Sequence, residues 1–107
     1  MKGADMYSRM MIMEANSEKQ TAELVKRLTE HAEAQGLAAD VMVDGDGRMV
    51  VFQTAHSTHD ALVLYSSSRM CRKLMTDTSY LLIGDHVVKV FRIANTTMAS
   101  FGKEVVA

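Results

Sequence analysis

The stretches that read as β-strands carry apolar side chains on both faces, yet the chain offers only two convincing helices to cover a sheet. Residues 49–53 and 86–93 show this most clearly, because valine, methionine and phenylalanine occupy both alternating sets. Helices packed on one face of an antiparallel sheet leave the other face without cover. We therefore expect the second face to be covered by something outside the monomer, which is a prediction about association rather than chemistry.

The size and composition indicate one folded domain spanning residues 1–107, with 1–5 as an N-terminal tail and 95–107 as a C-terminal tail or short helix. At 48% hydrophobic and 23% charged residues, the chain resembles an ordinary soluble protein. The formal net charge of -1 provides no long-range attraction to nucleic acid or anionic lipid. The single cysteine, Cys71, excludes an intramolecular disulfide and favours a reducing cytoplasm, and no apolar run is long enough to span a membrane.

Local signals predict the order of the elements. Ser17 starts a capping box, Gly36 is suited to a left-handed cap, and apolar residues recur at helical spacing between them, so we predict a helix over 18–35. The run Asp44-Gly45-Asp46-Gly47 predicts a hairpin that joins strands at 39–43 and 49–53.

The second half of the chain repeats this pattern. A hydroxyl and an acid after His56 indicate a second helix from about residue 58 to Met75. Gly84-Asp85 predicts a turn between strands at 80–83 and 86–93. Met6 to Glu14 is ambiguous, because tyrosine and isoleucine favour a strand whereas the methionines also suit a helix, and we favour the strand.

The resulting β-α-β-β-α-β-β order predicts an α+β fold that resembles the ferredoxin-like plait, with an antiparallel sheet and both helices on one face. If Met6–Glu14 is helical, the remaining α-β-β-α-β-β order resembles a roadblock or longin-type fold instead. The order is also similar to those of flavin-binding blue-light sensors and dimeric α+β barrel oxygenases. Those sensors imply a glutamine on the strand after the hairpin and an asparagine on the first helix. Gln53 is out of register and the helix has no asparagine, so we expect no flavin and no other cofactor.

The two faces of the predicted hairpin follow from its even-length loop, which pairs even-numbered with odd-numbered residues. One face would carry Val41, Val43, Val50 and Phe52, as a helix-covered core does. The other face is apolar in the middle and polar at its margins. We assign Met11 and Met13 to this second face, because flexible thioethers are common at binding surfaces. The predicted partner-binding residues are Arg9, Met11, Met13, Met42, Met49, Val51 and Gln53. Alternatively, these methionines fill core gaps and the C-terminal tail covers the sheet.

Three short clusters carry other possible chemistry. His56, His59 and Asp60 have ligand-type side chains at close spacing, but they are too few for a metal site, and a strand end followed by a helix cap explains them. The Asp44–Gly47 run lacks the further ligands of a calcium loop, so we interpret it as a turn. Arg69, Arg72 and Lys73 could bind an anion or an acidic partner, although cations near a helix C-terminus also compensate its dipole.

We draw three functional hypotheses from the sequence. The first is a non-enzymatic protein-binding module, a cytoplasmic regulator, adaptor or inhibitor of the kind common among phage and plasmid accessory proteins, which forms a homodimer or docks on another protein through the methionine-rich face. The second is a small dimeric ligand-binding protein or enzyme with an apolar cavity and a proton-transfer site at His56 or His59. The third is local nucleic-acid binding through Arg69, Arg72 and Lys73. We favour the first.

Overall fold

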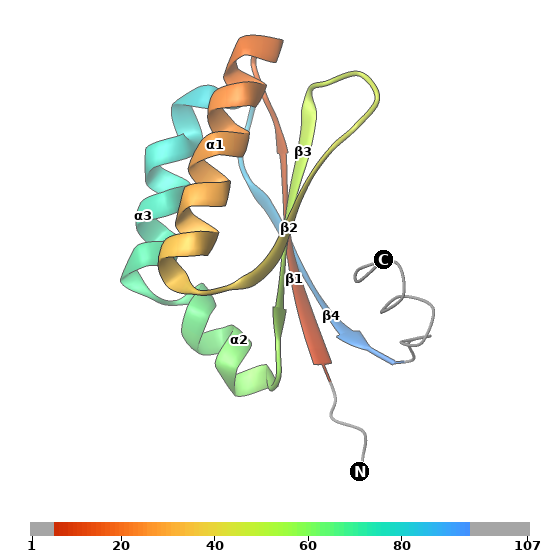
Figure 1. Ribbon diagram of the computed structural model, residues 1–107, viewed down its shortest axis with the longest axis vertical. Coiled ribbons are helices and arrows are strands. Elements are labelled where there is room, and N and C mark those ends of the chain that lie inside the picture. Colours follow the sequence, from red (N-terminus) through yellow and green to blue (C-terminus); the bar gives the residue numbers. More distant parts are fainter. Residues whose placement is uncertain (1–5, 95–107) are drawn as a thin grey trace.

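A computed structural model describes residues 6–94 as one antiparallel sheet with helices on one face (Figure 1). The element order is β1 (Met6–Glu14), α1 (Glu18–Gln35), β2 (Ala38–Val43), β3 (Met49–His56), α2 (His59–Ser66), α3 (Arg69–Thr78), η1 (Ser79–Leu81) and β4 (Val87–Ile93). The four strands lie in the order β2-β3-β1-β4, and every neighbouring pair is antiparallel. The predicted tails at 1–5 and 95–107 lie outside the described residues.

The strand prediction for Met6–Glu14 is confirmed, which removes the roadblock or longin alternative. The prediction of a helix over 18–35 is also confirmed. Ser17 accepts a hydrogen bond from the Gln20 amide at its start, and Gly36 ends it with a φ of 63°. That positive φ explains why a glycine stands there, since a Cβ would strain this conformation.

The β2–β3 hairpin has the predicted faces. Val41 lies opposite Phe52 and Val43 opposite Val50, which places these four residues on one face of the sheet. Asp40 lies opposite Gln53 and Met42 opposite Val51, on the other face. The strands are slightly longer than predicted, and Asp44 caps the turn by accepting hydrogen bonds from the amides of Arg48 and Met49, both at 3.1 Å.

Two predictions for the second half are wrong in detail. The second helix is divided into α2 and α3, because Ser68 starts a new helix by accepting a hydrogen bond from the Cys71 amide. The predicted strand at 80–83 is a short 3-10 helix followed by a single bridge between Leu82 and Ala15. Leu81 and Leu82 are buried in the core, and this burial ties the segment to the end of β1 rather than to β4.

The hydrophobic core lies between the sheet and the helix layer. It is formed by Met11, Met13, Leu24, Leu28, Val50, Phe52, Leu74, Leu81 and Leu82. Helix α1 packs on β2 and β3, and α2 packs on β1 and β3, whereas α3 packs on α1, α2 and η1. The opposite face of the sheet has no helix against it among residues 6–94 (Figure 1).

Candidate functional site

The predicted methionine-rich interface does not exist as a single surface. Met42, Met49, Val51 and Gln53 do lie on the sheet face that no described helix covers. Met11 and Met13 are on the other face, where Met11 lies opposite Phe52 and Met13 opposite Val50, and both are fully buried in the core. Our assignment of these two methionines was therefore wrong, because the pairing of β1 with β3, which no local signal encodes, decides which face they join.

Arg9 also lies on the helix-covered face, contrary to our assignment, and its position is unusual. It shares the alternating set of Met11 and is only 3% exposed. Its Nε and Nη1 atoms have no hydrogen-bond partner among the described residues. Nη2 has only a weak acceptor, the Met75 sulfur at 3.9 Å. The guanidinium lies over the Tyr65 ring, 5.5 Å from its centroid. A buried, ionised side chain without a carboxylate partner is rare, because leaving water costs several kcal/mol.

Polar side chains from four other parts of the chain surround this arginine. His56 of β3 stacks on Tyr65 of α2 with ring centroids 5.4 Å apart, and its Nε2 is 2.8 Å from the Thr54 hydroxyl. His31 of α1 has its Nε2 atom 2.8 Å from the Tyr65 hydroxyl. We call Arg9, His31, His56, Tyr65 and His86 the Arg9 cluster. Its members come from β1, α1, β3, α2 and the segment before β4, so only the folded chain brings them together.

The electrostatics of the cluster keep its histidines neutral. Burial lowers the pKa of His31 and of His56, and the positive charge of Arg9 lowers both pKa values further. Burial also lowers the pKa of His86, with Arg9 adding to the effect and Asp85 opposing it. Burial raises the pKa of Tyr65, so its hydroxyl stays protonated. The cluster therefore presents one fixed cation surrounded by neutral groups that can accept or share protons.

The hydrogen bonds of Thr78 define the tautomer of His86. The Thr78 hydroxyl donates its proton to the Leu74 carbonyl at 2.8 Å, so it can only accept from His86 Nε2 at 2.9 Å. Neutral His86 thus carries its proton on Nε2, and no residue within 6–94 donates a hydrogen bond to its Nδ1. The sequence reasoning did not single out this histidine as a site residue.

The other predicted site residues are not members of the Arg9 cluster. His59 contacts the Tyr7 ring at 5.5 Å between centroids, and Asp60 is exposed in the first turn of α2. Within residues 6–94, no group of three or more His, Cys, Asp or Glu side chains is arranged to hold a metal ion. The exposed cations of α3 lie on the outer helix layer, where Lys73 pairs with Asp77 at 2.8 Å. Anion or nucleic-acid binding by Arg69, Arg72 and Lys73 stays a prediction.

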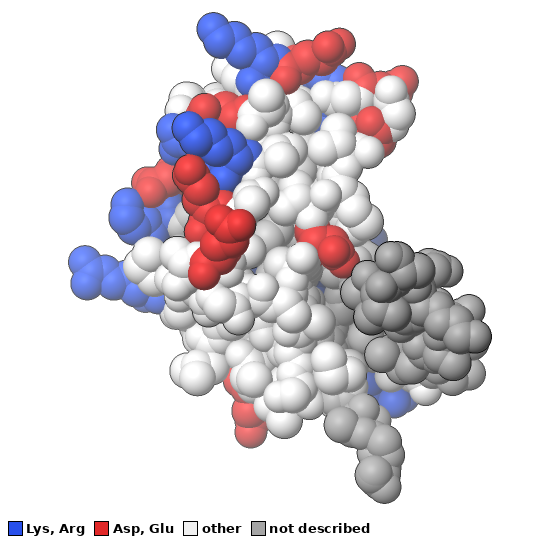
Figure 2. All heavy atoms as spheres, viewed as in Figure 1, with Lys and Arg blue, Asp and Glu red and all other residues white. Residues whose placement is uncertain are grey.

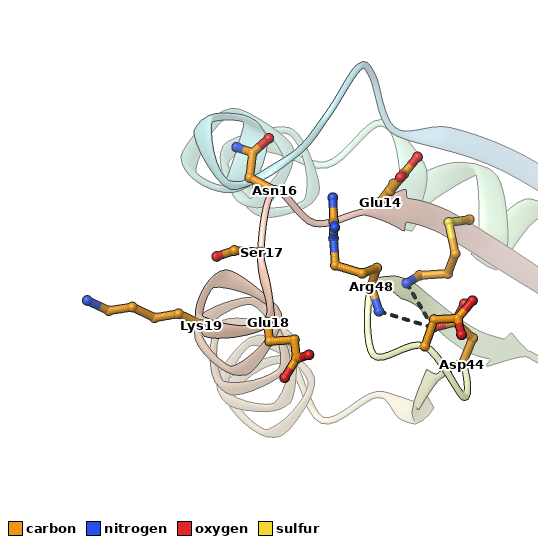
Figure 3. A pocket seen from close by; sticks show the side chains of 9 residues that line it. Glu14, Asn16, Ser17, Glu18, Lys19, Asp44 and Arg48 are labelled. Atoms are coloured by element: carbon orange, nitrogen blue, oxygen red, sulfur yellow. Dashed lines mark hydrogen bonds between the residues drawn. The ribbon is translucent and has the colours of Figure 1, made fainter.

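Charged side chains gather over the helices and the hairpin end, and the surface between them is largely uncharged (Figure 2). One hollow lies at the start of α1, next to the β2–β3 turn, and is lined by Glu14, Asn16, Ser17, Glu18, Lys19, Asp44, Asp46, Arg48 and Met49 (Figure 3). Hydrogen bonds from two backbone amides keep the pKa of Asp44 low, so this carboxylate serves the turn. Arg48 donates to the Ala15 carbonyl at 2.7 Å. Asp44 and Arg48 are thus engaged by groups of the protein itself.

The sequence did contain a signal for the cluster. Arg9 is the only charged residue within the run Met6–Met13, in an alternating set whose other members include two methionines. If that set is placed on the covered face, the arginine becomes buried, and it then needs an explanation. His31 and Tyr65 had no comparable signal, because their roles depend on how the helices pack.

Comparisons with solved structures identify the fold. Rv0793 from Mycobacterium tuberculosis matches with a TM-score of 0.72 and 13% identity, covering 86% of this chain and 98% of that one. A protein of Nitrosomonas europaea, described provisionally as an antibiotic biosynthesis monooxygenase, has a TM-score of 0.74 and 11% identity, covering 91% and 97%. A monooxygenase from the gene ActVA-Orf6 of Streptomyces coelicolor, in complex with the ligand Nanaomycin D, has a TM-score of 0.71 and 17% identity, covering 84% and 88%.

The chain thus has the α+β ferredoxin-like fold seen in antibiotic biosynthesis monooxygenases, a four-stranded antiparallel sheet with helices on one face. No protein-family model and no curated protein matches the sequence. These neighbours contradict our first hypothesis, a non-enzymatic binding module, since several proteins with this fold are named as monooxygenases and one holds a ligand. They favour the second hypothesis, a small ligand-binding protein or enzyme. No helix within residues 6–94 is long and apolar enough to cross a membrane.

Proposed function

We propose that this protein is a small cytoplasmic enzyme that binds an organic anion at the Arg9 cluster and oxidises it. The observation that carries the proposal is the buried guanidinium of Arg9, with two nitrogen atoms that have no partner among the described residues. A carboxylate or phenolate oxygen would supply the missing acceptor, and charge-assisted hydrogen bonds to a guanidinium are among the strongest in proteins. The names of the monooxygenase neighbours support oxidation as the reaction class.

The neutral histidines of the Arg9 cluster provide a base that removes a proton from the bound substrate. A substrate hydroxyl or activated C–H group must lose its proton before it becomes an electron-rich anion that dioxygen can oxidise. We assign the role of base to His56, because it stacks on the same tyrosine ring that Arg9 covers. In a monooxygenase reaction, one oxygen atom of dioxygen enters the substrate. The other atom leaves as water with the two hydrogens that the substrate loses.

A homodimer is part of this proposal. The uncovered sheet face exposes apolar side chains, among them Met42 at 41% and Val87 and Phe91 on the edge strand β4. Contiguous apolar surface of this kind favours burial against a second copy of the chain. The second copy would cover the face opposite the Arg9 cluster and leave the cluster free for a ligand. Light scattering should give the mass of a dimer.

The proposal is tested with a panel of small phenols and carboxylic acids in air-saturated buffer. Thermal shift measures binding, and an oxygen electrode measures turnover. We expect members of the panel to raise the melting temperature of the native protein and to be consumed with oxygen. Arg9→Met should lose both effects, whereas Arg72→Met, which removes an exposed arginine on α3, should keep them. His56→Gln should keep binding but lose turnover. If the panel stabilises Arg9→Met as well as the native protein, Arg9 does not bind the substrate.

A further inference from the structure

Two histidines of the Arg9 cluster are each paired with a buried threonine. The Thr54 hydroxyl lies 2.8 Å from His56 Nε2. The Thr78 hydroxyl lies 2.9 Å from His86 Nε2. Both threonine side chains are fully buried, so bulk water does not reach either hydroxyl. A hydroxyl has one proton to donate and can also accept, and a neutral imidazole has one protonated nitrogen and one with a lone pair. The destination of the threonine proton therefore decides which histidine nitrogen is basic.

The two threonines differ in the other acceptors that they reach. Thr78 ends α3 and donates its proton to the Leu74 carbonyl at 2.8 Å, as helical threonines commonly do. Thr54 lies on β3, between β1 and β2, and its hydroxyl has no hydrogen-bond partner except His56 in the part of the chain that the structure describes. An unpaired donor at this position would lose the hydrogen bond that it makes to water in the unfolded chain. The Thr54 hydroxyl thus donates to His56 Nε2, in the opposite direction to the hydrogen bond of the other pair.

The charge of Arg9 favours the same direction. Thr54 lies opposite Arg9 in the register of β1 and β3, and opposed residues project from one face with Cβ atoms about 5 Å apart. A nearby cation attracts the hydroxyl oxygen and repels its proton, so the hydroxyl turns its proton away from Arg9. Burial and the charge of Arg9 both lower the pKa of His56, which keeps its ring neutral. Neutral His56 then carries its proton on Nδ1 and its lone pair on Nε2.

We propose that Thr54 is a positioning residue, which holds His56 as the tautomer with its proton on Nδ1. The lone pair lies on Nε2, so Nε2 is the atom that takes up a proton when His56 acts as the base. His86 has the opposite tautomer, because Thr78 accepts from its Nε2. In each ring, the hydrogen bond of one nitrogen sets the protonation of the other. The role of His56 as a base rests on the proposed function, whereas its tautomer is a property of the ligand-free fold.

The tautomers are measured by NMR on the full chain labelled with 15N at histidine, at pH 7.5 and without ligand. The 15N chemical shift distinguishes a ring nitrogen that carries a proton from one that carries a lone pair. The native protein should show the proton of His56 on Nδ1, and His56→Gln identifies its signals. Thr54→Ser keeps the hydroxyl and should give the same tautomer. Thr54→Val keeps the shape of the side chain but removes the donor, so the proton of His56 should be distributed over both nitrogens.

Thr29→Val is the matched control. Thr29 is exposed on α1, and its hydroxyl donates to the Val25 carbonyl rather than to a histidine, so this variant should leave the His56 signals unchanged. A native protein with the proton of His56 on Nε2 would show that Thr54 accepts, and this result would overturn the inference. The inference is also overturned if Thr54→Val keeps the native tautomer, because another group then sets it.

Turnover tests the positioning role. With a substrate found in the panel of phenols and carboxylic acids, Thr54→Val should keep binding in thermal shift but lower kcat at least about tenfold, and Thr54→Ser should restore kcat. Full turnover by a Thr54→Val protein whose tautomer has changed would overturn the positioning role. If the native protein oxidises no member of the panel, the proposed function fails, and the NMR result still decides whether Thr54 sets the tautomer.

Discussion

Replacing Arg9 with methionine should make the ligand-free protein more stable. The guanidinium is buried with two unpartnered nitrogens, and its compensating contacts are a sulfur at 3.9 Å and the Tyr65 ring at 5.5 Å. Removing such a charge from water costs several kcal/mol, of which a cation–π contact returns about 2 kcal/mol. Methionine has a similar length, no charge, and a thioether that adapts to its surroundings. We expect Arg9→Met to raise the free energy of unfolding by about 2 kcal/mol.

The corresponding shift in melting temperature follows from the size of the chain. An unfolding entropy of about 2.1 cal/mol/K per residue, over the 107 residues of the chain, makes each kcal/mol worth about 4.5 °C. The variant should therefore melt about 9 °C above the native protein in calorimetry without ligand. Arg72→Met, which removes an exposed arginine, should change the melting temperature by less than about 2 °C. A variant that melts below the native protein would show that the fold already satisfies Arg9 and would refute our reasoning.

Three further predictions concern the histidines of the Arg9 cluster, the buried methionine Met11 and the N-cap residue Ser68. The three histidines of the Arg9 cluster have lowered pKa values in the folded protein and an ordinary value of 6.5 when unfolded. As the pH falls through 6.5 the unfolded chain takes up protons first, so the free energy of unfolding should decrease by up to about 1.4 kcal/mol per histidine per pH unit, and by less in Arg9→Met. The urea midpoint should fall accordingly, and equal midpoints at pH 7.5 and 5.5 would contradict this. Met11→Ala should cost about 2–5 kcal/mol in urea denaturation, whereas Met70→Ala, at an exposed position of α3, should cost under about 0.5 kcal/mol, and similar losses would show that Met11 is not a core residue. Ser68→Ala should cost about 1 kcal/mol by removing the cap that starts α3, and an unchanged urea midpoint would show that the cap is not needed.

The fold was predictable where the signals are local. Ser17, Gly36 and the Asp44–Gly47 turn each dictate a backbone conformation through their own chemistry, and the elements that they delimit came out as expected. The segment at 80–83 was not predictable in this way. Its leucines suit a strand equally well, and only their burial against the end of β1 makes the chain form a short helix and a bridge. The division between α2 and α3 had a usable signal in the serines at 66–68, since a serine is a strong N-cap.

The candidate site was less predictable because it depends on strand pairing. The alternation within β1 correctly groups Arg9 with Met11 and Met13, but it does not say which face the group joins. We chose the face from the character of methionine, and the pairing with Phe52 and Val50 shows the opposite. A surface rich in methionine and a core rich in methionine have the same local pattern. The lone arginine in the set was the better guide, because burying its charge has a cost that marks its face as unusual.

The pairing of β1 with β3 also explains why the fold tolerates the buried charge of Arg9. A slip of β1 by one residue would turn Arg9 to the other face, but it would also turn Met11 and Met13 out of the core. Each buried methionine contributes about 1.5–3 kcal/mol, so the pair offsets several kcal/mol of charge burial and holds the register. The core residues of β1 thus stabilise the position of its arginine. A ligand that neutralises Arg9 would remove the remaining cost, so that binding free energy and fold stability increase together.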